Sequence, residues 1–285
     1  MALSPHFTRD HRIYFVFLEQ RGALSGLAIA RATLDADRLA LNDATVIFRA
    51  HPDLDADTNL GGRLMFGADG FLYATIGDRF LGSEAQRLDS DLGKVIRITA
   101  DGAIPAGNPF VHRSDALPEI YALGQRNAEG IAADAGGRIW TVENGAKGGD
   151  ELNLLRKGAN YGWPVITYGR GYDDKPIGTG TARAGLVQPV YYWDPSIATS
   201  GFTFYDGRLA RSWRGNLFLA SLKGRHVARL VMQHGEVVAQ EQILGELQAR
   251  IRDVREGPDG ALYILTDAVK GRLVRVLPTF QSARR

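Results

Sequence analysis

A recurring phrase constrains the fold of this chain more than any other feature of its sequence. The phrase is a tight turn that contains glycine and leads directly into a short apolar run, and it begins at Gly67, Asp134, Arg214 and Gly257. Asp-Gly and Gly-Asn turns of this kind commonly lead into β-strands. Glycine is abundant, with 34 residues in a chain of 285, against a usual share of about 7%. The chain is therefore predicted to consist of many short strands.

The spacing of these units favours one all-β architecture. Three of the four turns are followed by a second candidate strand, over Lys94–Ile98, Ala228–Val231 and Leu273–Leu277. Helical spacing is confined to Ser83–Leu92 and Ile243–Gln248. Short strands in a repeated unit indicate a barrel, a sandwich or a propeller, and a repeat of roughly 40–50 residues favours the β-propeller.

The repeat is interrupted by loops but by no interdomain linker, so residues 1–285 are predicted to form a single β-propeller domain. The polar stretch Gly145–Gly185 is interpreted as an insertion between strands. Long loops on a repetitive β scaffold commonly carry binding sites. The tail Gln281–Arg285 is expected to fray.

Composition excludes several classes of function. Because the chain has no Cys, it has no disulfide, thiolate metal site or cysteine nucleophile. A formal net charge of +2 gives no electrostatic case for a nucleic-acid partner. No apolar run approaches the roughly 18 residues that a membrane span needs. The run Ile13–Leu18 is shorter than the roughly 7–15 apolar residues of a secretory signal, so we predict a β-strand there and no signal peptide in this chain.

Two glycine-rich segments contain candidate binding residues. Arg126 and Asn127 lie between Gly124 and Gly130, where glycine permits close backbone approach and arginine offers two parallel donors to a carboxylate. An ion pair with a neighbouring blade explains Arg126 equally well. The turn Asn144–Glu151 frees backbone carbonyls, which are hard oxygen ligands suited to Ca²⁺. A plain surface loop is the alternative, and the six histidines show neither metal-ligand spacing nor a Ser or Asp partner.

Three further cations follow later in the chain. Lys223 comes after a candidate strand, and Arg250 and Arg252 alternate, so on a strand both face the same side. Two like charges on one face are unfavourable unless an anion lies between them or solvent screens them. We hypothesise that these three residues and Arg126 line one pocket for a polyanionic small molecule. A solvated strand edge remains the alternative for the two alternating arginines.

Several motifs together carry a family resemblance that runs from about Ala2 to Pro278. The chain resembles the soluble aldose sugar dehydrogenases that depend on pyrroloquinoline quinone (PQQ), also called the glucose/sorbosone dehydrogenase family. The segments that carry the resemblance are Gly61–Leu64, Tyr73–Asp78, Gly93–Arg97, Gly107–Phe110, Arg126-Asn127, Gly148–Glu151, Asn160–Pro164, Arg250–Asp253 and Gly257–Gly260.

The resemblance implies a six-bladed β-propeller that binds PQQ near its axis and passes the anomeric hydride of an aldose sugar to the quinone, giving a lactone. An external electron acceptor then reoxidises the cofactor. The residues implied to contact PQQ are Arg126, Asn127, Lys223, Arg250 and Arg252, with Asp267 behind them. The Gly145 and Ala146 carbonyls would hold the Ca²⁺ beside the quinone, and Glu151 with the Tyr161 carbonyl matches a second, structural Ca²⁺ site. Trp193 falls where the family has an aromatic residue near the sugar.

The chain departs from the family pattern in three places. Asn59 occupies the position of the histidine base, and an amide cannot accept a proton near neutral pH. Asp78 matches the carboxylate that orients that base. Glu129 adds a negative charge close to an anionic cofactor. The resemblance also begins late, so the first blade is expected to be missing or incomplete.

These departures leave two main hypotheses open. The first is a PQQ- and Ca²⁺-dependent aldose dehydrogenase whose activity is reduced because its base is absent. The second is a catalytically silent propeller that binds PQQ, a sugar acid or a protein partner. Calcium-dependent hydrolysis of lactones has little support in the sequence. The resemblance implies a periplasmic location, and the absence of an export signal leaves the cytoplasm open. The sugar and the oligomeric state stay undetermined.

Overall fold

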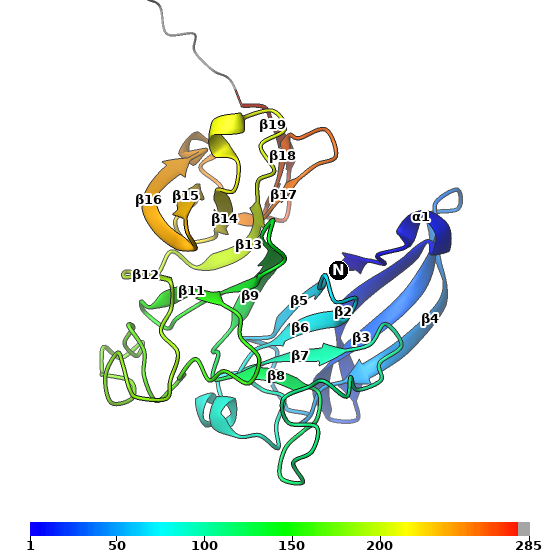
Figure 1. The fold of residues 1–285 in the computed structure, drawn as a ribbon, viewed down its shortest axis with the longest axis vertical. Coiled ribbons are helices and arrows are strands. Elements are labelled where there is room, and N and C mark those ends of the chain that lie inside the picture. The colour runs from blue at the N-terminus through cyan, green and yellow to red at the C-terminus, as the bar shows by residue number, and fades with distance from the viewer. Residues whose placement is uncertain (279–285) are drawn as a thin grey trace, which may run out of the picture.

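The strands of this protein form five antiparallel sheets that follow one another in chain order, which confirms the all-β propeller (Figure 1). The computed structural model describes residues 1–278, so the prediction for Gln281–Arg285 lies outside the described residues. Five sheets are found there, where the resemblance implies six blades. Within residues 1–278, no helix has the length and apolar character needed to cross a bilayer.

The first sheet has the longest strands and the shortest one. It contains β1 (Ala2–Leu3), β2 (Arg12–Arg21), β3 (Leu24–Asp35) and β4 (Ala40–Arg49), with the short helix α1 (Phe7–Asp10) after β1. The strand predicted at Ile13–Leu18 is therefore confirmed within β2. The two-residue β1 lies beside a cavity of about 310 Å³ that Met1, Arg63 and Asp253 help to line, where the first sheet approaches the last.

The other four sheets repeat one plan. The second sheet has β5 (Gly61–Phe66), β6 (Leu72–Ile76), β7 (Lys94–Ile98) and β8 (Ile120–Leu123), and the third has β9 (Ala128–Ala133), β10 (Ile139–Glu143), β11 (Asp150–Leu154) and β12 (Tyr191–Trp193). The fourth has β13 (Thr199–Phe204), β14 (Leu217–Ser221), β15 (Val227–Gln233) and β16 (Glu236–Ile243), and the fifth has β17 (Ile251–Glu256), β18 (Leu262–Thr266) and β19 (Leu273–Val276). The four glycine-turn phrases lead into β6, β10, β14 and β18, the second strand of each sheet.

The sequence indicates helical spacing only in two short segments, Ser83–Leu92 and Ile243–Gln248. They contain 3₁₀ turns at Gly82–Gln86 and Gly245–Leu247, and a third turn lies at Arg211–Trp213. These segments are too short to complete a stable helix.

One sequence expectation needs correction. The insertion predicted over Gly145–Gly185 contains β11, which pairs with β10. The irregular loop therefore begins only after Leu154.

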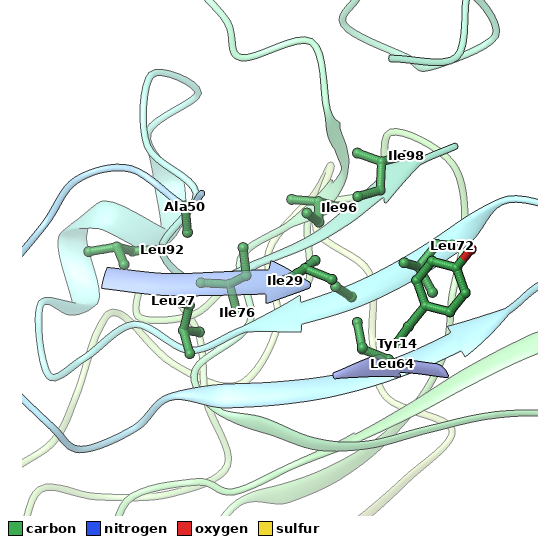
Figure 2. Packing of buried hydrophobic residues seen from close by; sticks show 11 residues of the cluster. Tyr14, Leu27, Ile29, Ala50, Leu64, Leu72, Ile76, Leu92, Ile96 and Ile98 are labelled. Carbon is green, nitrogen blue, oxygen red and sulfur yellow. The ribbon is translucent and has the colours of Figure 1, made fainter. Parts of the chain in front are cut away.

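Apolar side chains fill the space between successive sheets. In the first such cluster, Leu27 and Ile29 from β3 pack with residues of the second sheet, among them Leu72 and Ile96 (Figure 2). Similar clusters lie between the second and third, third and fourth, and fourth and fifth sheets, centred on Val95, Trp140 and Phe218 respectively. Strands β5, β9, β13 and β17 are successive neighbours, and they are therefore the innermost strands of their sheets.

Candidate functional site

The four innermost strands begin at one end of the molecule, and this end gathers the candidate residues. The antiparallel register pairs the start of each inner strand with the end of the second strand: Gly61 with Ile76, Ala128 with Glu143, Thr199 with Ser221, and Ile251 with Thr266. Residues just before an inner strand and just after a second strand therefore meet at one surface, which we call the site face. The opposite surface carries the glycine turns.

A cavity of about 450 Å³ opens on the site face, and we call it the central cavity. It is lined by Asn59, Arg126, Asn127, Asn144, Gly145, Ala146, Lys147, Tyr172, Ser196, Ala198, Lys223 and Arg250. Its volume lies in the range of about 300–1,000 Å³ typical of small-molecule sites. The structure thus brings together seven predicted site residues, Asn59, Arg126, Asn127, Gly145, Ala146, Lys223 and Arg250, and their roles in catalysis and in cofactor or metal binding stay predictions. Cations and amides are a donor set that fits a planar tricarboxylate.

Arg126 is almost fully buried in the wall of this cavity, yet its side chain pairs with no carboxylate among the described residues. Its Nη1 donates to the carbonyls of Gly145 at 2.5 Å and Asn144 at 3.1 Å. Its guanidinium carbon lies 5.4 Å from the ring centroid of Trp163 and 5.9 Å from that of Tyr172. A buried guanidinium held by dipoles and aromatic faces keeps its charge available to an anion.

The alternating arginines have an anion between them, and it is supplied by the protein. Asp267 Oδ2 accepts from Arg250 Nε at 2.9 Å, and its Oδ1 lies 3.3 Å from Arg252 Nη2. Burial raises the pKa of Asp267, but the hydrogen bond from Arg250 and the charge of Arg252 outweigh burial and hold that pKa below its ordinary value. Arg250 reaches the central cavity, whereas Arg252 is not among its lining residues.

Asn59 and Asp78 are in direct contact at the edge of the central cavity. Asn59 Nδ2 donates to Asp78 Oδ1 at 2.9 Å, and Trp163 Nε1 donates to Asp78 Oδ2 at 2.8 Å. The backbone N–H of Phe80 adds a third donor at 3.0 Å. Asp78 is buried and held by these donors, so it orients the side chain at position 59 and does not itself reach the cavity.

A second, much smaller cavity shares Arg126, Asn144 and Gly145 with the central cavity and is lined by Glu143, Glu151 and Tyr161 as well. Its volume of about 10 Å³ suits one water or one ion. Asn153 Nδ2 donates to both carboxylates, at 3.1 Å to Glu143 and 3.2 Å to Glu151. Both acids are buried in the same region.

The pKa values of these two acids are displaced upward. Burial, with the charge of Glu151 added, raises the pKa of Glu143 well above its ordinary value. Burial also raises the pKa of Glu151 to about 7, although the hydrogen bond from Asn153 opposes this shift. Two adjacent buried carboxylates require protons or a cation. The donor set of acidic and carbonyl oxygens fits the structural Ca²⁺ that the resemblance implies for Glu151 and Tyr161.

The other implied Ca²⁺ ligands are backbone carbonyls in the turn after β10. Asp150 fixes this turn, because its carboxylate accepts from the N–H groups of Gly145 and Ile197, both at 2.9 Å. Asp150 therefore orients the turn. Within residues 1–278 no group of three or more His, Asp or Glu side chains is placed to hold a metal. Gly145 and Ala146 both line the central cavity, and their carbonyl chemistry fits a hard cation, with Arg126 on one side of the Gly145 oxygen.

Trp193, the residue predicted to lie near the sugar, is placed away from the central cavity. Trp193 is buried in the apolar cluster between the third and fourth sheets, and its Nε1 donates to Gln240 at 2.7 Å. It is not among the residues that line the central cavity, so this position gives no support to a sugar contact. Sequence reasoning missed the lining residues Asn144, Lys147, Tyr172, Ser196 and Ala198. Lys147 and Tyr172 fall in the glycine-rich turn and the long loop that the sequence did single out.

Comparisons with known proteins point in one direction. Residues 1–275 match the family model described as glucose/sorbosone dehydrogenase. The chain is 38% identical over 282 residues to aldose sugar dehydrogenase YliI of Escherichia coli K12, covering 98% of this chain and 76% of the relative.

Two solved structures extend this likeness to three dimensions. The apo-form of the soluble aldose sugar dehydrogenase from Escherichia coli superposes with a TM-score of 0.94 at 38% identity, covering 97% of this chain and 81% of that one. The PQQ-bound aldose sugar dehydrogenase from Streptomyces coelicolor gives 0.76 at 28% identity, covering 96% and 76%.

Proposed function

Because the chain belongs to the glucose/sorbosone dehydrogenase family, we propose that it is a PQQ- and calcium-dependent oxidoreductase that oxidises aldose sugars at the anomeric carbon to lactones. The observation that carries this proposal is the convergence of Arg126, Lys223 and Arg250 on one cavity. PQQ, when bound, supplies a two-electron acceptor for the sugar, and an external acceptor removes the electrons. We also propose the periplasm as the compartment of the protein.

The cationic side chains bind and orient the cofactor in this proposal. Arg126 and Lys223 have no ion pair to a carboxylate among the described residues, so their charges are available to carboxylates of the ligand. Arg250 shares Asp267 with Arg252 and contributes a weaker attraction. Asn127 is fixed beside them, because its Oδ1 accepts from the Gly61 N–H at 2.9 Å.

Calcium has two proposed positions. The carbonyls of Gly145 and Ala146 would hold one ion at the wall of the central cavity, where a hard cation acts as a Lewis acid toward a quinone oxygen. Glu151 and the Tyr161 carbonyl would hold the other, with Glu143 close by in the same small cavity. The second ion would remove the charge conflict between the two buried acids.

The described residues of the site supply no evident general base for the proton-accepting step. Among residues 1–278, no carboxylate or imidazole side chain lines the central cavity, and Asn59 stands where the family has its base. General-base catalysis typically contributes about 10²–10⁴ in rate. We therefore propose that turnover is reduced. A catalytically silent propeller that binds PQQ, a sugar acid or a protein partner is the second candidate, and Asn59 is the observation that favours it.

We further propose that the five sheets occupy five positions of the six-bladed family architecture. The sixth position would lie between the fifth sheet and the first. Two features support this assignment: the fifth sheet has three strands where the second, third and fourth have four, and β1 is two residues long. A crystal structure with the five sheets spaced evenly around a closed ring would contradict it.

The proposed function is tested by adding PQQ and Ca²⁺ to the purified protein and following dye reduction with a panel of aldoses. Saturable PQQ binding with slow, sugar-dependent reduction is expected. Saturable binding without any reduction would favour the silent propeller. Absence of both binding and reduction would reject the dehydrogenase and the PQQ-binding form of the silent propeller, and would leave a sugar acid or a protein partner as the remaining ligand of the second candidate.

A further inference from the structure

Glu129, the second residue of β9, lies against Arg252, an arginine on β17 of the fifth sheet. Its Oε2 lies 3.0 Å from Arg252 Nη1, and its Oε1 accepts from Asn127 Nδ2 at 3.2 Å. The Glu129 side chain is 21% exposed and that of Arg252 is 38% exposed, so solvent screens this pair only in part. The carboxylate therefore connects a residue of the central cavity to an arginine just behind it.

Arg252 is consequently held by acids on two sides. Arg252 Nη1 pairs with the Glu129 carboxylate, and Arg252 Nη2 pairs with the Asp267 carboxylate. Asp267 also accepts a hydrogen bond from Arg250. Two arginines and two carboxylates sum to no net charge. Arg126 and Lys223, in contrast, form no ion pair with a carboxylate among the described residues. The attraction of the site for an anion is thus concentrated on one side of the cavity.

We infer that Glu129 is a specificity-determining residue that acts as an internal counter-ion: it occupies the guanidinium of Arg252 and weakens binding of a tricarboxylate cofactor. This inference rests on the proposed function. A carboxylate of the ligand that approaches this side meets a paired arginine and a like charge, and both lower its affinity. The affinity for a ligand with fewer acid groups is lowered less.

The test is the dissociation constant for PQQ, measured by titration calorimetry with the full chain in the presence of Ca²⁺. Glu129→Gln keeps the size and the acceptor of the side chain and removes its charge, so we expect binding about 10-fold tighter than in the unaltered protein. The gain should shrink at high ionic strength. Glu129→Asp keeps the charge and should gain far less.

Glu241→Gln provides a matched control. Glu241 pairs with Arg229 at 2.6 Å on the fourth sheet and is not among the residues that line the cavity. Removing its charge changes the net charge by the same amount and should leave PQQ binding unchanged. In an Arg252→Gln background, Glu129→Gln frees no guanidinium, so any gain that remains there measures the like-charge repulsion alone. Circular dichroism confirms that each variant is folded.

The outcomes separate this inference from the proposed function. If the unaltered protein binds PQQ saturably and Glu129→Gln binds it equally or more weakly, the inference is overturned and the proposed function stands. An equal gain in Glu241→Gln would also overturn the inference, because the effect would then be one of net charge. If neither the unaltered protein nor Glu129→Gln binds PQQ, both proposals fall.

Discussion

The two faces of the propeller are built by the same strands and on different principles. On the face opposite the site, the turns repeat: Gly70, Gly137 and Gly260 each donate a backbone N–H back to the residue three positions earlier. On the site face, the connections differ in length and in residue type from sheet to sheet. The repeated glycine turns therefore belong to the scaffold, and the unequal connections on the site face leave room for one cavity.

Hydrogen bonds around the turns show the same contrast. Tyr73 donates to Asp69 at 2.8 Å while Arg97 on the next strand donates to the same oxygen at 2.8 Å. In the fifth sheet, Tyr263 and Arg275 bind Asp259 in the same arrangement, at 3.2 and 2.7 Å. On the site face, by comparison, one donor serves two acids: Asn153 donates to Glu143 and Glu151, and Arg252 pairs with Glu129 and Asp267. Acids opposite the site hold turns, and acids on the site face position or neutralise functional groups.

The largest expected effect tests the chemistry of the site face. Asn59→His would restore an imidazole beside Asp78, which already holds the side chain at position 59 at 2.9 Å. We expect sugar-dependent dye reduction to rise about 10²–10⁴-fold in the presence of PQQ and Ca²⁺. Asn59→Gln is the control, since it cannot accept a proton. An unaltered protein that already turns over at the rate of the histidine variant would show that the base lies elsewhere.

Two glycines compare the tolerance of the faces directly. A Cβ at Gly77 would collide with the carbonyl of Asn59, whereas a Cβ at Gly70 would meet nothing within 4 Å. We expect Gly77→Ala to lower the free energy of unfolding by about 3 kcal/mol and to weaken PQQ binding. Gly70 has a φ of 79°, so Gly70→Ala should cost about 1 kcal/mol through left-handed strain alone. Urea denaturation measures both, and equal losses would contradict the comparison.

The pH dependence of stability should differ between the faces. Because burial raises the pKa of Glu151 to about 7 from 4.5, the folded state binds more protons than the unfolded state between these values. Stability of the metal-free protein should therefore fall as pH rises from about 4.5 to 7, on the order of 2 kcal/mol. Glu151→Gln should flatten this slope, and Ca²⁺ should offset the loss above pH 7.

For Asp259 on the opposite face, we expect the pH dependence of stability to have the reverse sign. The hydrogen bond from Arg275 lowers the pKa of Asp259 from 3.8, so the stability that Asp259 contributes is present above pH 3.8 and disappears as pH falls through its folded pKa. Asp259→Asn should consequently lower the free energy of unfolding at neutral pH and leave it unchanged in strong acid. Denaturation series at several pH values measure both effects, and parallel pH profiles for the two variants would refute this distinction.

The smallest effect concerns a single hydroxyl on the opposite face. Tyr73→Phe removes the donor to Asp69 and leaves the buried ring in place. We expect a loss of about 1 kcal/mol in the free energy of unfolding and no change in PQQ affinity. Tyr263→Phe, in the corresponding arrangement of the fifth sheet, should lose less, because its hydrogen bond is longer and more exposed. A change in PQQ affinity in either variant would contradict this prediction and would show that the two faces are energetically coupled.

The sequence predicts the repeated face well, because its signals are local. A glycine turn and the strand after it are encoded within about ten residues, so β6, β10, β14 and β18 could be assigned without knowledge of the rest of the chain. The two short segments with helical spacing form only 3₁₀ turns, because so few residues cannot complete a stable helix.

The site face was predictable only in part, because its contacts join distant residues. The cationic residues themselves led to the hypothesis of one pocket lined by Arg126, Lys223, Arg250 and Arg252. The structure brings the first three to one cavity, whereas Arg252 is not among its lining residues. Glu129 pairs with Arg252 across 123 positions, and no local pattern encodes such a contact. Trp193 was expected near the sugar, but the strand alternation turns its ring into the core. Tyr172 lies in a loop without regular structure, so its direction could not be read from any periodicity.

The position of Trp163 makes it an optical reporter for the central cavity. Its indole faces the Arg126 guanidinium and donates to Asp78. Trp140 and Trp193 are enclosed between the third and fourth sheets, and Trp213 packs against the cluster between the fourth and fifth. An occupant that draws Arg126 toward itself alters the polarity around only one of these four indoles. Emission from the native protein therefore carries a signal of occupancy without any attached dye.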